Sequence, residues 1–162
     1  MVIWESWPMF LRGTVMAVQL CFLFLFVGIA VGMPTSIMQV YGNKVARASA
    51  SIFEQTFRGL PALVLLFLFY FGLSTFNVSP LVAATLAMGL RSAAYQSQIF
   101  RGAIQSIESG QMVAARAIGM SRFKAIRSII IPQAIRLAIP PWSNEYANVM
   151  KDTSYVFVVG IV

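Results

Sequence analysis

The sequence predicts an all-α fold, a polytopic bundle of transmembrane helices, from its composition and from the continuity of its apolar runs. Hydrophobic residues make up 59% of the 162-residue chain and charged residues only 10%, with a mean hydropathy of +0.78. Soluble domains carry about 25% charged residues, so this composition favours a bilayer. Two long stretches, 13–43 and 59–90, contain no charged residue. Their apolar runs do not alternate, and backbone groups in lipid must bond internally, so helices are favoured.

Four spans are predicted along the chain, followed by the start of a fifth. A helix needs about 20 apolar residues to cross the hydrocarbon core. The four candidate segments are 13–33, 52–73, 80–100 and 133–150. The second should bend near its start, at the RGLP sequence, where Arg58 is expected to extend its charge toward the interface. The fourth gives the weakest signal because it contains prolines and charged residues.

Basic residues collect in two segments between the predicted spans, and they predict the orientation in the membrane. Lys44 and Arg47 lie in the loop at 41–51, and the loop at 101–127 carries five basic residues against the single acid Glu108. Cytoplasmic loops carry an excess of Lys and Arg. We therefore expect a multi-pass protein of the cell (inner) membrane, with both loops cytoplasmic and the N-terminus outside. The net charge of +7 is interpreted as this topology signal rather than as a nucleic-acid-binding surface.

The chain lacks residues that several enzyme classes require. It has no histidine, which excludes Ser-His-Asp chemistry and disfavours a zinc centre. It also has no GxxxxGK[ST] phosphate loop, so any ATP must be bound by another subunit. We expect no catalytic residue, no metal site and no cofactor bound by this chain.

The segment 110–127, GQMVAARAIGMSRFKAIR, is small, basic and amphipathic. Val113 and Phe123, ten positions apart, fall on one helical stripe. Gly119 between them permits a turn, and Ser121 is suited to N-cap a second short helix. On these residues alone, an amphipathic helix lying on anionic headgroups and a docking element for a cytoplasmic partner are equally compatible with the pattern.

Four motifs make the chain resemble a known family. The segment GQMVAARAIGMSRFKAIRSIIIPQA at 110–134 is similar to the EAA loop of ABC-importer membrane subunits. Three further motifs resemble permeases of the polar amino-acid uptake family: FRGLP at 57–61, RSAAYQSQIFRGAIQSI at 91–107 and NEYANVMKDTSYVFVVG at 144–160. The motifs occur in the family's order, and the similarity covers nearly the whole chain.

The resemblance implies a membrane-spanning permease subunit of an ATP-driven ABC importer of type I for polar amino acids, a transport subunit rather than an enzyme. The implied partners are ABC ATPase subunits that bind ATP and Mg, a second permease in a homo- or heterodimer, and an extracytoplasmic substrate-binding protein. The family has five helices, so residues 1–162 are expected to form one transmembrane domain that lacks its C-terminal span. Two competing hypotheses are a secondary transporter or channel without an ATPase partner, and a structural membrane scaffold.

The resemblance also assigns the cytoplasmic segment to ATPase coupling. Its small residues would pack closely, its glycine would let the helix turn, and Arg116 would pair with charge on the ATPase. The expected coupling residues are Val113, Ala114, Ala115, Arg116, Ala117, Gly119, Ser121 and Arg122. Val113 stands where the family usually has Glu, and Gln55 and Gln98 also stand where Glu is frequent. All three differences remove negative charge, which weakens the case for a cationic substrate.

Ionisable residues near the end of the fourth span predict a substrate path. Such groups are costly in a membrane and usually face a cavity or a partner, and a free amino acid needs a site with both signs of charge. The predicted path residues are Arg91, Tyr95, Asn144, Glu145, Asp152, Thr153 and Ser154. Structural roles compete with this interpretation. Arg91 would form a structural ion pair inside the bundle with Glu145 or Glu54. Tyr95 would pack between helices, and the adjacent Lys151 and Asp152 would be charges at the membrane interface.

Overall fold

The structure is a computed structural model that describes residues 7–160, and every regular element in that range is a helix. The predicted all-α class is therefore confirmed for the described part of the chain. In chain order the elements are α2 (Trp7–Tyr41), α3 (Lys44–Gly59), α4 (Ala62–Ser74), α5 (Pro80–Gln105), α6 (Ser109–Ala117), α7 (Arg122–Ala125), a π-helix (Ile126–Ile130), α8 (Ile131–Asp152) and a 3₁₀ helix (Thr153–Val159).

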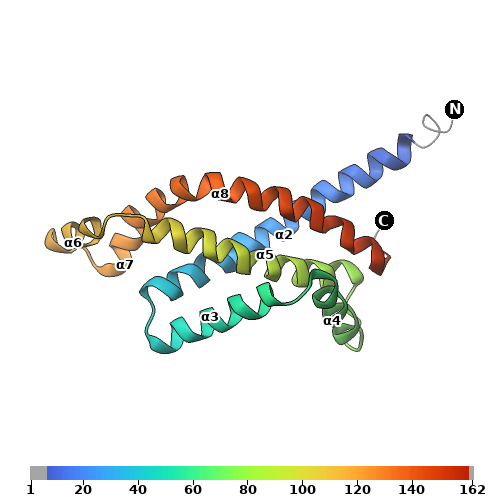
Figure 1. Ribbon diagram of the computed structural model, residues 1–162, viewed down its shortest axis with the longest axis horizontal. Coiled ribbons are helices and arrows are strands. Elements are labelled where there is room, and N and C mark those ends of the chain that lie inside the picture. Colours follow the sequence, from blue (N-terminus) through green and yellow to red (C-terminus); the bar gives the residue numbers. More distant parts are fainter. Residues whose placement is uncertain (1–6, 161–162) are drawn as a thin grey trace.

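Helix α5 is the centre of the bundle and contacts α2, α3, α4 and α8. The long helices run along the longest axis of the molecule, with α6 and α7 at one end and α4 toward the other (Figure 1). The turn between α2 and α3 lies at the same end as α6 and α7. The two basic loops predicted to share the cytoplasmic side therefore share one end of the bundle.

Small residues let α2 and α5 approach closely. A Cβ added at Gly32 would lie 2.7 Å from the carbonyl oxygen of Ala93, and one added at Gly89 would lie 2.7 Å from Cβ of Val27. A Cβ at Gly28 would collide with the side-chain amide of Gln96. Because real side chains do not tolerate such distances, these glycines set the spacing of the two helices.

The first predicted span is longer than expected. The sequence placed its end at Met33, before Pro34, whereas α2 continues through Pro34 to Tyr41. The last turns of the helix bury Ser36 and Gln39 against the bundle, so tertiary packing stabilises a helix that the proline alone would weaken.

The second predicted span is two helices rather than one. Helix α3 ends at Gly59 and α4 begins at Ala62, and their axes differ by 105°. Leu60 is extended, with φ −84° and ψ 137°, and Pro61 has no N–H to continue a helix. The expectation of a bend at RGLP is confirmed, but the continuous span over 52–73 is wrong.

By length and composition alone, α2 is the single described helix that qualifies as a membrane span, and the bent pair α3–α4 would be a second. Helices α5 and α8 contain 26 and 22 residues, which is long enough for a hydrocarbon core of about 30 Å. Their hydropathy is lower because both contain polar residues, which in α5 include the buried Gln96 and in α8 the buried Glu145 together with exposed residues such as Arg136.

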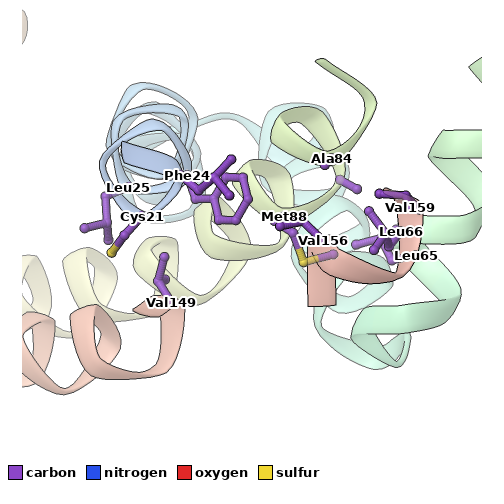
Figure 2. Packing of buried hydrophobic residues seen from close by; sticks show 12 residues of the cluster. Cys21, Phe24, Leu25, Leu65, Leu66, Ala84, Met88, Val149, Val156 and Val159 are labelled. Atoms are coloured by element: carbon purple, nitrogen blue, oxygen red, sulfur yellow. The ribbon is translucent and has the colours of Figure 1, made fainter. Parts of the chain in front are cut away.

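The main hydrophobic core joins five elements: α2, α4, α5, α8 through Val149, and the 3₁₀ helix (Figure 2). Phe24 of α2 and Met88 of α5 pack with Leu66 of α4 and Val156 of the 3₁₀ helix. Phe24 and Leu66 are completely buried. The core therefore anchors the end of α8 and the following 3₁₀ helix against α5, which positions the polar residues described next.

Candidate functional site

A cavity of about 230 Å³ opens between α5, α8 and the 3₁₀ helix. Its lining is polar and carries charges of both signs. The lining residues are Arg91, Tyr95, Glu145, Asn148, Lys151, Asp152 and Tyr155. Four of the seven predicted path residues, Arg91, Tyr95, Glu145 and Asp152, are thus brought together around one space.

An ion pair closes one wall of the cavity. Nη1 of Arg91 on α5 donates to Oδ2 of Asp152 on α8 over 2.5 Å. The two side chains are 20% and 17% exposed, so water screens the pair only in part. The structural role that competes with a substrate path paired Arg91 with Glu145 or Glu54; Arg91 does form an internal ion pair, but its carboxylate partner is Asp152.

Tyr95 lies one turn after Arg91 on α5, and the Arg91 guanidinium carbon is 5.0 Å from the centre of its ring. This distance is within the range of a cation–π contact. The ring therefore lines the cavity and also contacts its cationic group, so Tyr95 does more than fill space between helices.

Three lining residues were absent from the predicted path: Asn148, Lys151 and Tyr155. Two of them could have been found by helical periodicity. From Glu145, the positions three, seven and ten residues later are Asn148, Asp152 and Tyr155, which fall on one face of a helix. Lys151 lines the cavity together with Asp152.

The remaining predicted path residues lie outside the lining. Asn144 is exposed elsewhere on α8. The hydroxyl of Thr153 donates to the carbonyl of Met150, and that of Ser154 donates to the carbonyl of Lys151. Adjacent positions in the sequence point to different sides of a helix, so a cluster in sequence did not become a cluster in space.

The predicted coupling segment forms a helix, a turn and a second short helix. Gly119 has φ +83°, a left-handed conformation that glycine adopts at little cost. Ser121 caps α7 as expected, since its hydroxyl accepts from the backbone N–H of Lys124 at 3.2 Å. The single helical stripe through Val113 and Phe123 is wrong, because the turn at Gly119 separates them onto two helices.

Most of the predicted coupling residues are exposed at this end of the bundle. Ala115 is buried, at 2% exposure, and attaches the segment to the fold. Nη1 of Arg116 donates to the carbonyl of Met120 over 2.9 Å and so closes the turn. Val113 and Phe123 are 68% and 73% exposed. The exposed residues are Val113, Ala114, Arg116, Ala117, Gly119, Ser121 and Arg122.

The predicted coupling segment meets the bundle at further places besides the buried Ala115. The guanidinium of Arg122 lies 5.4 Å from the centre of the Tyr41 ring at the end of α2. On its other side, α7 continues through the π-helix directly into α8. A displacement of this segment would therefore be transmitted to both long helices.

This fold and this exposed basic segment have a counterpart among known proteins. The family described as binding-protein-dependent transport system inner membrane components matches residues 25–161. The chain belongs to this family. Membership in it favours a transport-system subunit over a secondary transporter, a channel or a scaffold.

Several amino-acid permeases of the family are similar over nearly the whole chain. The nopaline transport system permease protein NocM of Agrobacterium fabrum is 36% identical over 170 aligned residues, which cover 98% of this chain and 70% of NocM. The glutamine transport system permease protein GlnP of Escherichia coli strain K12 is 34% identical over 163 residues, covering 98% of this chain and 74% of GlnP.

Solved structures of ABC transporters show the same fold. A crystal structure of an amino acid ABC transporter with histidines superposes with a TM-score of 0.85 at 34% identity, covering 99% of this chain and 76% of that one. The MetNI methionine ABC transporter in an inward-facing form gives a TM-score of 0.77 at 20% identity, which covers 93% of this chain and 73% of that one and shows the likeness of fold alone.

Proposed function

We propose that the chain is the permease subunit of an ABC importer and that it conducts a zwitterionic polar amino acid through the cavity at Arg91. The observation that carries the proposal is the pairing of charges in that cavity. Arg91 and Lys151 supply cations, and Glu145 and Asp152 supply carboxylates. A free amino acid presents one group of each sign, so such a lining is complementary to it.

The chemistry of the lining assigns a role to each group. The Arg91 guanidinium suits a carboxylate because its planar fork donates two parallel hydrogen bonds. Glu145 and Asp152 suit an ammonium group, and Asn148 offers an amide to a polar side chain. Substrate entry would exchange the Arg91–Asp152 bond for bonds to the substrate, so the ion pair would be remade when the substrate leaves.

The energy for transport would come from partner subunits. In this proposal, ATP and Mg are bound by a pair of ABC ATPases, and the exposed segment 109–125 docks on them. A second permease, identical or different, and an extracytoplasmic binding protein complete the assembly. Support for the docking comes from the exposed apolar Val113 and Phe123 flanked by basic residues, since interfaces join apolar contacts with charge complementarity.

The test is reconstitution of the complex in liposomes with the ATPase and the binding protein encoded beside it. Uptake of radiolabelled glutamine, glutamate and arginine would be measured with ATP and with a non-hydrolysable analogue inside. We expect accumulation of at least one of the three with ATP only. Arg91→Met should abolish that accumulation while the ATPase still co-purifies.

Two outcomes would overturn the proposal. Uptake that needs no nucleotide would identify a secondary transporter or a channel. Full uptake by Arg91→Met would show that the cavity at Arg91 is not on the substrate path. Arg47→Met, which removes an exposed cation of α3 far from the cavity, is the matched control and should behave as the unmodified protein.

A further inference from the structure

The ring of Tyr95 lies beside two guanidinium groups, and only one of them belongs to the cavity. Arg91 approaches it from the same helix at 5.0 Å, and Arg58 approaches from α3 with its guanidinium carbon 5.2 Å from the ring centre. Both distances fall within the range of a cation–π contact. Arg58 does not line the cavity, so the transport chemistry proposed above leaves it without a role.

Arg58 is itself held in place by Glu54, which in turn is bound by Gln39. Its Nη1 donates to Oε1 of Glu54, one turn earlier on α3, over 2.5 Å. The second carboxylate oxygen of Glu54 accepts from Nε2 of Gln39 on α2 at 3.1 Å. Glu54 is only 8% exposed, so its charge is held where water screens it weakly. The sequence suggests that Arg58 extends its charge toward the membrane interface; in the structure its side chain is 40% exposed and pairs with Glu54.

The result is one chain of polar contacts across four helices: Gln39 on α2, Glu54 and Arg58 on α3, Tyr95 and Arg91 on α5, and Asp152 on α8. Each cation beside the ring has its own carboxylate, so the chain is neutral as a whole. Two guanidinium groups would repel each other beside one ring if either carboxylate were absent.

We propose that Arg58 and Glu54 are positioning residues that act through the ring of Tyr95 to hold the Arg91 guanidinium in the substrate cavity. This inference rests on the proposed function only for its transport consequence. With Arg58 in place, the ring has a fixed cation on it and presents a fixed surface to Arg91. Without Arg58, the ring and the Arg91 side chain gain rotational freedom, and the bond to Asp152 alone holds the cation in the cavity.

The test measures the freedom of Arg91 directly, without a substrate. Phenylglyoxal reacts with accessible guanidinium groups, and mass spectrometry of the peptide containing Arg91 gives the rate of its modification in the purified protein in nanodiscs. The variant Glu54→Gln with Arg58→Met removes the α3 ion pair without leaving an unpaired buried charge. We expect Arg91 to react roughly fivefold faster in this variant, since the cation–π contact that is lost between Arg58 and Tyr95 contributes on the order of 1 kcal/mol.

Three further variants make the result specific. Arg58→Lys keeps a cation beside the ring and should react at the rate of the unmodified protein. Arg47→Met on the exposed side of α3 should do the same. Tyr95→Leu removes the ring and should accelerate modification of Arg91 to a similar extent, which keeps the proposal testable where the double variant fails to fold.

An unchanged Arg91 rate in either a monodisperse double variant or Tyr95→Leu would overturn the inference, because a purely structural α3 ion pair has no reason to affect Arg91. In the reconstituted importer, the double variant should take up labelled glutamine, glutamate or arginine several-fold more slowly, and Arg58→Lys should restore the rate. Absence of uptake by the unmodified complex would count against the proposed function alone, since the Arg91 rates are measured without transport.

Discussion

At the scale of single residues, the cavity is defined by an ion pair between Arg91 and Asp152, 61 positions apart in the chain. Arg91 also contacts the Tyr95 ring, while its Nε is buried without a hydrogen-bond partner among the described residues. A buried donor without a partner costs free energy, so Arg91 is held by its bond to Asp152 and by the Tyr95 ring rather than by a complete set of hydrogen bonds.

The structural and transport roles of this pair are separable by mutation. Asp152→Asn leaves a partly buried guanidinium without its counter-charge, which is expected to destabilise the fold by about 3 kcal/mol. Arg91→Met with Asp152→Asn removes both charges and should recover most of the thermal stability in detergent but none of the uptake. Recovery of uptake together with stability would mean that the pair is structural only.

At the scale of elements, two glycines determine how helices meet and how the coupling segment turns. Gly32 lies where α2 crosses α5. A Cβ added at this position would be 2.7 Å from a backbone oxygen of α5. Gly119 has the positive φ that ends α6 and aims α7. Gly32 is needed because there is no space for a side chain, and Gly119 is needed because of its backbone conformation. Substitutions at the two positions should therefore disturb the protein in different ways.

Substitution of Gly32 by Ala should lower the stability of the bundle. The new methyl group meets a backbone oxygen that cannot rotate away, and overpacking of this kind costs about 1–3 kcal/mol. Gly72→Ala in α4 is the matched control, since a Cβ there has open space within 4 Å. Thermal unfolding in detergent, followed by tryptophan fluorescence, should show a lower midpoint for Gly32→Ala alone; equal midpoints would contradict the close α2–α5 contact.

Substitution of Gly119 by Ala should impair coupling rather than the bundle. A left-handed alanine costs about 1–2 kcal/mol, which would shift the turn between α6 and α7. Gly110→Ala, in the helical part of α6, should be tolerated or slightly stabilising. Co-purification of the ATPase should fall for Gly119→Ala and stay unchanged for Gly110→Ala. Unchanged co-purification for Gly119→Ala, or a loss for Gly110→Ala alone, would count against the coupling role of the turn.

At the scale of the whole molecule, the two basic loops lie at one end of the bundle and the loop between α4 and α5 lies toward the other. Several charges of the first end are exposed, including Lys44, Arg47 and Lys124. An excess of basic residues marks the cytoplasmic side of a membrane protein. The shape of the bundle and its charge distribution therefore predict the same orientation.

Labelling from one side of the membrane tests that orientation. In a Cys21→Ala background, Ser49→Cys and Ser106→Cys place exposed thiols at the basic end, and Thr75→Cys places one at the other end. A membrane-impermeant maleimide should label Thr75→Cys in intact cells, and the other two only in inverted vesicles. Labelling of Ser49→Cys and Ser106→Cys from opposite sides would contradict the topology.

Much of the fold followed from local sequence because its causes are local. Continuous apolar runs predict helices in lipid, the RGLP sequence predicts a bend, and Gly119 followed by Ser121 predicts a turn and a new helix. Each depends on residues within a few positions of one another, and each is present in the structure. The helix–turn–helix form of the predicted coupling segment was recognisable for the same reason, since its motif is contiguous.

The rest was decided by tertiary structure because it depends on the rotation of helices about their axes. Asp152 rather than Glu145 meets Arg91, and Arg58 meets the ring of Tyr95, only once α3, α5 and α8 have packed with particular faces inward. The 105° bend likewise places α3 beside Tyr95. The sequence alone determined that the chain is helical and where the bend at RGLP, the turn at Gly119 and the charges occur along it, whereas the helix bounds and which charges face one another across the cavity required the packing of the bundle.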